Sequence, residues 1–209
     1  DYSKLCNYYN GLTSEKDFIS SYFPQFIDAV DNLLKKYLWC VPANTMEAHP
    51  VGSLYQHMRN CASISAALYA KLHSTEPAIE PPFMIIAADL NGIQNYLYDL
   101  NPENSAKASK LLRARSFQIQ MILEMAAHKV VSELGLSHQS IILDHGGKWF
   151  ILANNSQANE SKLQALKSII YREMYVHFLG TVSMNITWDN KLGLFDLNKK
   201  YFLKSMTKC

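Results

Sequence analysis

The sequence is short of the features that define several classes of protein. Its 209 residues contain four cysteines, far apart and without a CxxC pair, so we expect free thiols in a reducing cytosol rather than a disulfide framework. No apolar run approaches the roughly 20 residues that span a bilayer, and no signal-peptide pattern opens the chain. The formal net charge is only +2, so any nucleotide or phosphate site must be local. We predict a cytoplasmic protein without a membrane segment.

What the sequence does contain is an ordinary globular composition, with 48% apolar and 18% charged residues. Residues 1–73 are typical of helices: Ser53-Leu-Tyr-Gln56 is a capping box, and Pro24 fits the first turn of an earlier helix. The segment 74-STEPAIEPP-82 predicts a stiff linker. We therefore expect a helical domain with its linker over residues 1–80, a second domain over 81–190, and the start of a truncated linker domain over 191–209.

Residues 83–188 predict strands alternating with helices. An apolar strand runs from Phe83 to Asp89, a short helix covers 91–100, and a long helix covers 106–134. A hairpin around Gly146-Gly147 follows, then a helix over 160–178 and a strand over 182–188. This βαββαβ order predicts an α+β, ferredoxin-like fold whose first and third strands are central, because both are unbroken apolar runs. Since those strands are apolar on both faces, we expect both faces of the sheet to be covered.

In that topology the end of the first strand lies beside the hairpin turn, where polar side chains gather. Two carboxylates, Asp89 and Asp144, would suit a divalent cation if they approach each other, and glycines in the turn would admit a base or phosphate. Lys148 can reach a phosphate as a point charge. The candidate nucleotide-binding residues are Asp89, Asn91, Gly92, Gln94, Asp144, Gly146, Gly147 and Lys148. The candidate contacts to phosphate or nucleic acid, near the start of the long helix, are Lys107, Lys110, Arg113 and Arg115.

Each of these features also has a purely structural interpretation. A strand-terminal Asp often accepts hydrogen bonds in a turn, a Gly-Gly pair is a common hairpin turn, and a basic cluster on a helix is usually a solvated face. No second His or Asp stands at metal-ligand spacing from His57, so that residue is predicted to pack rather than to bind metal. Taken singly, these signals do not separate a site from a turn.

Several segments, in this order, resemble blocks of one known family. The segments 88-ADLNGIQNYLY-98, 108-ASKLLRARSF-117 and 144-DHGGKWFIL-152 resemble its "GDISGIQ", "AAKSLRGRSF" and "SGGGKF" blocks. Upstream, 53-SLYQHMRNCASISAALY-69 looks like its "SLYDHSKTTAAIAAALY" helix at the close of an HD domain. The family is the large palm-domain subunit of type III CRISPR effector complexes, in its Csm-type branch. The resemblance runs from about Trp39 to Trp188.

The resemblance implies a fragment that holds the end of the HD-like domain and the first of two palms. The family's HD nuclease motifs lie upstream and its GGDD cyclase motif downstream. The full-length subunit is therefore expected to make cyclic oligoadenylates from ATP, with Mg²⁺ or Mn²⁺, and to cut single-stranded DNA in antiviral defence. The implied partners are the other subunits of the ribonucleoprotein complex and, indirectly, guide RNA and target RNA.

This chain departs from the family pattern at the hairpin turn. The turn reads Gly-Gly-Lys-Trp, without the acids of an active palm, and Asp144-His145 stands where the family often has Ser. The resemblance thus implies a degenerate palm with no catalytic residues, which helps to hold one of two ATP molecules and binds no metal of its own. The fragment itself requires no cofactor.

Two other functions stay open. Trp149 and Phe150 on a central strand could stack bases in a ferredoxin-like RNA-binding module, although their wholly apolar strand favours core packing. A stand-alone nucleotide cyclase of the GGDEF type is disfavoured, because the hairpin lacks the acidic pair.

Overall fold

The computed structural model describes residues 15–46, 52–74, 79–99 and 108–193. The chain forms two compact units, residues 1–58 and 59–209, which are described separately below. Within the described ranges, no helix combines the length and the apolar character needed to cross a membrane.

The first unit is helical, as the sequence predicts. It holds α2 (Glu15–Leu38) and the first residues of α3 (Leu54–Leu72). The N-cap of the predicted capping box is present, because the Ser53 hydroxyl accepts a hydrogen bond from the Gln56 N–H at 3.1 Å. The prediction for Pro24 is wrong: α2 begins at Glu15, so Pro24 lies inside the helix rather than in its first turn. A helix can pass through a proline when it forgoes one backbone hydrogen bond.

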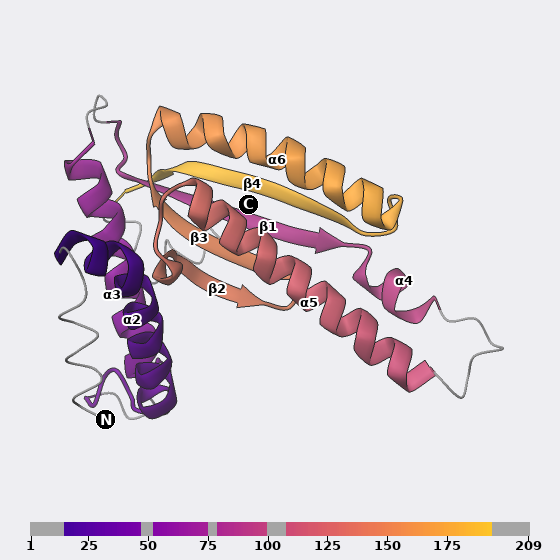
Figure 1. The fold of residues 1–209 in the computed structure, drawn as a ribbon, viewed down its shortest axis with the longest axis horizontal. Coiled ribbons are helices and arrows are strands. Elements are labelled where there is room, and N and C mark those ends of the chain that lie inside the picture. The colour runs from indigo at the N-terminus through magenta and orange to yellow at the C-terminus, as the bar shows by residue number, and fades with distance from the viewer. Residues whose placement is uncertain (1–14, 47–51, 75–78, 100–107, 194–209) are drawn as a thin grey trace. The chain divides into compact units, whose positions relative to one another are not determined.

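The second unit contains one four-stranded antiparallel sheet. Its strands are β1 (Phe83–Asn91), β2 (Ile141–His145), β3 (Lys148–Asn154) and β4 (Ser183–Leu192). Their order across the sheet is β2-β3-β1-β4, which puts the first and third strands in the centre. The α+β fold and the position of both apolar strands are therefore confirmed (Figure 1).

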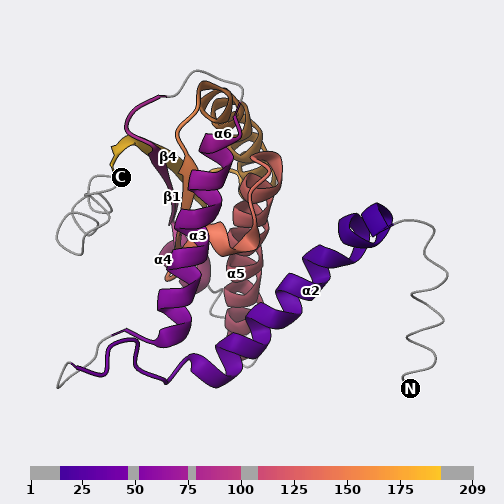
Figure 2. The same ribbon diagram turned by 90° about the vertical axis from the view of Figure 1, so that its left-hand side faces the viewer.

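Two long helices cover one face of this sheet, α5 (Ala108–Glu133) and α6 (Gln157–Phe178). Figure 2 shows both on the same side of the strands. They enclose a core that includes Ile86, Val130, Trp149 and Leu163, all 0% exposed. The helix α6 begins three residues before the predicted start, because the Ser156 hydroxyl accepts a hydrogen bond from the Asn159 N–H and caps it.

The other face of the sheet is covered by the second half of α3. Ala67 of that helix belongs to a buried cluster of sheet residues, and Ile64 and Leu68 pack against it. The sheet residues of the cluster are Phe83, Ile85, Ala87, Ile142, Phe150, Leu152 and Leu192. The expectation that both faces are covered is confirmed for this apolar part of the sheet.

Candidate functional site

The C-terminal end of β1 lies beside the β2–β3 hairpin turn, as the topology predicts. The Leu90 N–H donates a hydrogen bond to the Gly147 carbonyl oxygen at 2.9 Å, and Asp89 stands opposite Lys148 in the strand register. The short helix α4 (Ile93–Tyr98) follows β1 directly and lies next to α5. Three separate parts of the chain therefore meet at one end of the sheet.

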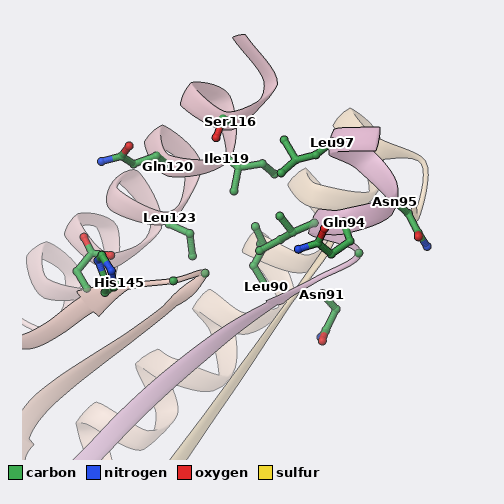
Figure 3. A pocket seen from close by; sticks show the side chains of 15 residues that line it. Leu90, Asn91, Gln94, Asn95, Leu97, Ser116, Ile119, Gln120, Leu123 and His145 are labelled. Carbon is green, nitrogen blue, oxygen red and sulfur yellow. The ribbon is translucent and has the colours of Figure 1, made fainter. Parts of the chain in front are cut away.

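A hollow of about 720 Å³ opens at this junction. Leu90 and Gln94 face Ile119 and Leu123 of α5 across it, whereas Asn91 and Asn95 point away (Figure 3). The remaining lining residues are Gly92, Ile93, Leu97, Ser116, Gln120, Asp144, His145, Gly146 and Gly147. Six of the eight predicted nucleotide-binding residues thus line one hollow: Asn91, Gly92, Gln94, Asp144, Gly146 and Gly147. Sequence reasoning missed the α5 wall, because its residues carry no signal beyond helical periodicity.

The two glycines of the hairpin turn have different surroundings. Both have a positive φ, 64° at Gly146 and 88° at Gly147, which favours glycine. A Cβ at Gly147 would lie 2.7 Å from the Cδ1 atom of Ile93, so the turn packs against α4 there. A Cβ at Gly146 would meet no heavy atom within 4 Å. Gly146 is therefore the point where a ligand can approach the backbone of the turn.

Asp89 and Lys148 do not line the hollow. Strand residues alternate between faces, and the neighbours Ala88 and Trp149 belong to the core beneath α5 and α6, so Asp89 and Lys148 lie on the opposite face. Their side chains form an ion pair, with 3.2 Å between Lys148 Nζ and Asp89 Oδ2, and both are about half exposed.

The ion pair belongs to a polar row that crosses all four strands. In the register, His145 pairs with Lys148, Lys148 with Asp89, and Asp89 with Asn185 of β4. Sequence reasoning missed Asn185, because nothing in the sequence states which residue of the last strand lies opposite Asp89. The row reaches the hollow at His145, which also lines it, whereas Lys148, Asp89 and Asn185 do not line it.

Asp144 lies on the face that α5 covers, so the two predicted carboxylates are not brought together. Its register partner is Trp149, which belongs to the core on that face, and the charges that act on it include Glu124 and His128 of α5. Among the described residues, no group of three or more His, Cys, Asp or Glu side chains could hold a metal ion. The idea that Asp89 and Asp144 share a divalent cation is therefore dropped.

Burial raises the pKa of the Asp144 carboxyl above its usual value of 3.8, and the negative charge of Glu124 acts in the same direction. The positive charges of His128, Arg59 and His145 oppose this shift. An acid with a raised pKa in the folded state stabilises the fold below the unfolded pKa and loses that contribution as the pH rises through the folded pKa. At neutral pH, ionised Asp144 therefore slightly destabilises the folded state.

Replacing Asp144 with Asn is expected to raise stability at pH 7. The amide keeps the shape and removes the partly desolvated charge, and the gain should be only ~0.3–0.5 kcal/mol because the side chain is largely exposed. Urea unfolding at pH 7 and at pH 3.5 measures this. The gain should be present at pH 7 and absent at pH 3.5, where wild-type Asp144 is largely protonated. A loss of stability at pH 7 would show that the carboxylate makes a stabilising interaction.

The basic residues near the start of α5 have different surroundings. Lys110 and Arg113 are exposed on the first turns of the helix. The Arg115 side chain is already engaged in hydrogen bonds within the chain, because its Nη1 donates to the carbonyl oxygens of Tyr96 and Asp99 at 2.6 and 2.8 Å. Lys107 lies outside the described residues. Lys110 and Arg113 are therefore the better candidates for contact with a phosphate.

The aromatic pair on β3 does not form a platform for bases. Trp149 is 0% exposed in the core beneath α5 and α6, and Phe150 is 9% exposed in the cluster beneath α3. A base stacks on an open ring face, and neither ring offers one. This packing argues against a base-stacking platform on β3.

Comparison with known proteins gives a consistent result. The family model described as "Csm1 subunit domain B" matches residues 82–206, which is more than half of the chain. The chain belongs to the Csm1 family. Csm1 is the Csm-type large subunit of type III CRISPR complexes, so the resemblance seen in the sequence blocks is confirmed.

A curated relative from Thermococcus onnurineus, a "CRISPR system single-strand-specific deoxyribonuclease Cas10/Csm1 (subtype III-A)", is 28% identical over 167 residues, covering 77% of this chain. A solved Csm1–Csm4 cassette in complex with AMPPNP superimposes with a TM-score of 0.73 at 26% identity, over 87% of this chain and 25% of that one. A cassette in complex with cA4 gives 0.72 at 25% identity, with the same coverage. The chain spans 21% of the length of the Thermococcus relative.

Proposed function

We propose that this chain forms half of an ATP-binding site in the large subunit of a type III CRISPR effector complex. The half-site is the first, degenerate palm, and ATP bound there serves the synthesis of cyclic oligoadenylates by the full-length protein in antiviral defence. The observation that carries the proposal is the hollow at the end of β1, walled by α4, α5 and the Gly146-Gly147 turn.

The shape and chemistry of the hollow suit part of a nucleotide. Leu90, Ile119 and Leu123 give it an apolar wall for a base, and the Gln94 amide can hydrogen-bond to a base edge. Related Csm1 proteins have been solved with AMPPNP and cA4, both of which contain adenine. An adenine nucleotide is therefore the proposed ligand.

The charged groups around the hollow suggest how the rest of the nucleotide lies. The open side of Gly146 admits a phosphate to the backbone, and Lys148, which follows the turn on the other face of the sheet, can contact a triphosphate that extends past the turn, with Asp89 and Asn185 beside it. Lys110 and Arg113 add positive charge at the start of α5. Asp144 would repel a phosphate, so we assign it to a ribose hydroxyl or a base amino group.

The Mg²⁺ or Mn²⁺ that accompanies ATP does not fit the residues that the structure describes. Asp89 is paired with Lys148, and Asp144 lies on the other face. The proposal therefore places the metal ligands, and the catalytic residues, in another part of the full-length subunit. The other subunits of the ribonucleoprotein are the proposed partners; one of them corresponds to Csm4 in the solved cassettes, and guide and target RNA are reached through the complex.

The test is a titration of this chain with ATP in which two-dimensional NMR detects binding through chemical-shift changes. Because half a site buries little of the ligand, we expect a Kd on the order of hundreds of micromolar or weaker. Gly146→Asn should weaken ATP binding about tenfold, since the new side chain occupies the open approach to the turn. Asparagine tolerates a positive φ, so the fold should keep its stability.

The matched control is Gly135→Asn, at the C-terminal end of α5. Gly135 has nearly the same φ, 67°, and equally open surroundings, but it lies outside the hollow. This variant should bind ATP as the wild type does. If the wild-type chain shows no shifts with millimolar ATP, or if Gly146→Asn binds as tightly as Gly135→Asn, the half-site proposal fails.

A further inference from the structure

The helix α4 supplies one wall of the hollow, yet it has only six residues. A helix this short is not stable by itself in water, so its position depends on what holds its two ends. Gln94 and Leu97, which line the hollow, lie between those ends. Whatever fixes α4 therefore fixes this wall.

A side chain of α5 binds the backbone at the C-terminal end of α4. Arg115 donates hydrogen bonds from Nη1 to the carbonyl oxygens of Tyr96 and Asp99, at 2.6 and 2.8 Å. Carbonyls in the last turn of a helix have no partner within the helix, and a guanidinium is a strong donor for them. The same guanidinium lies over the Tyr96 ring, with its carbon 5.0 Å from the ring centre.

Tyr96 adds a second contact with α5 and extends the connection to α6. Its hydroxyl donates a hydrogen bond to Gln118 Oε1 of α5 at 2.6 Å, and its ring meets that of Phe178 of α6 edge-on, 5.2 Å between centres. Arg115 thus connects the end of α4 to α5. A lysine could donate to one carbonyl but could not stack in a plane on the ring.

We propose that Arg115 is a positioning residue for the nucleotide half-site: it holds α4 against α5 so that Gln94 faces the hollow. This inference rests on the proposed function, because the readout is ATP binding. Without Arg115, α4 samples positions in which the wall of the hollow is displaced. The apparent affinity for ATP then falls in proportion to the remaining population of the competent position.

The experiment compares Arg115→Ala and Arg115→Lys with Arg172→Ala in this chain. Arg172 of α6 is 72% exposed and pairs only weakly with Glu173, at 3.4 Å. Arg172→Ala therefore removes the same positive charge as Arg115→Ala, but outside the hollow. ATP titrations by NMR should give a Kd about five- to tenfold higher for Arg115→Ala, a smaller rise for Arg115→Lys, and no change for Arg172→Ala. The backbone amide shifts of Arg115→Ala without ATP should change mainly over α4.

The outcomes separate the two proposals. If the wild-type chain does not bind ATP, the proposed function fails and this inference fails with it. If the wild type binds ATP and Arg115→Ala binds equally well, only the positioning role is refuted. Amide shifts that change throughout the sheet, with Arg115→Lys no better than Arg115→Ala, would also refute it, because they would show a general structural role.

Discussion

Replacing Gly92 with Ala is expected to destabilise the second unit more than any other single methyl group added at this site. Gly92 has a φ of 84°, and a Cβ there would lie 2.0 Å from the carbonyl oxygen of Thr181. That oxygen is backbone, held in a turn in which the Thr181 N–H bonds to the Phe178 carbonyl oxygen at 2.9 Å, so it cannot swing aside. The β1–α4 junction or the start of β4 must move instead.

We expect a loss of about 3 kcal/mol or more, which lowers the urea midpoint by roughly 1–2 M. Far-UV circular dichroism during urea unfolding measures this. The control is Gly135→Ala, which has a similar φ of 67° but open surroundings, and which should lose only about 1 kcal/mol through backbone strain. Equal losses in the two variants would mean that contact with Thr181 is not what requires a glycine at position 92.

The fold was predictable because local and global signals agree along most of the second unit. Two apolar strands, the Gly-Gly turn and helix-ending Gly135 each specify one element, and the βαββαβ order leaves few arrangements. The start of α6 was missed although a capping residue, Ser156, stands in the sequence. In the first unit the sequence predicts a helix that begins near Pro24, because propensity alone does not show when a helix continues through a proline.

The site was harder to predict because β2 contains one extra residue relative to β3. A β-bulge between Ile141 and Leu143 adds an extra residue to β2. Strand side chains alternate with a period of two, so one inserted residue moves everything after it to the other face. Without the bulge, Asp144 would lie opposite Lys148 and share the face of Asp89. With the bulge, Asp144 lies on the face that α5 covers, and no feature of the sequence predicts the extra residue.

Gly147→Val is expected to abolish detectable ATP binding in the millimolar range while the chain stays folded. The φ of 88° strains a β-branched residue by ~1–3 kcal/mol, which a domain of ordinary stability tolerates. The structure gives a reason for the loss of binding other than simple blocking of the turn. The new side chain would meet the Cδ1 atom of Ile93, which lies 2.7 Å from a Cβ at this position. Ile93 is the first residue of α4, so either α4 or the turn must shift, and both line the hollow.

Gly180→Val separates this effect from strain alone. Gly180 has a φ of 85°, but a Cβ there meets nothing within 4 Å, and the residue lies at the α6–β4 connection, outside the hollow. Both valine variants should therefore lose stability in urea through backbone strain, and Gly147→Val somewhat more because of Ile93. Only Gly147→Val should lose the chemical-shift changes that ATP causes in the wild type. Gly147→Ala, in which only the end of the Ile93 side chain has to move, should retain partial binding. If Gly147→Val binds ATP as Gly180→Val does, the Gly146-Gly147 turn closes a hairpin and takes no part in a nucleotide site.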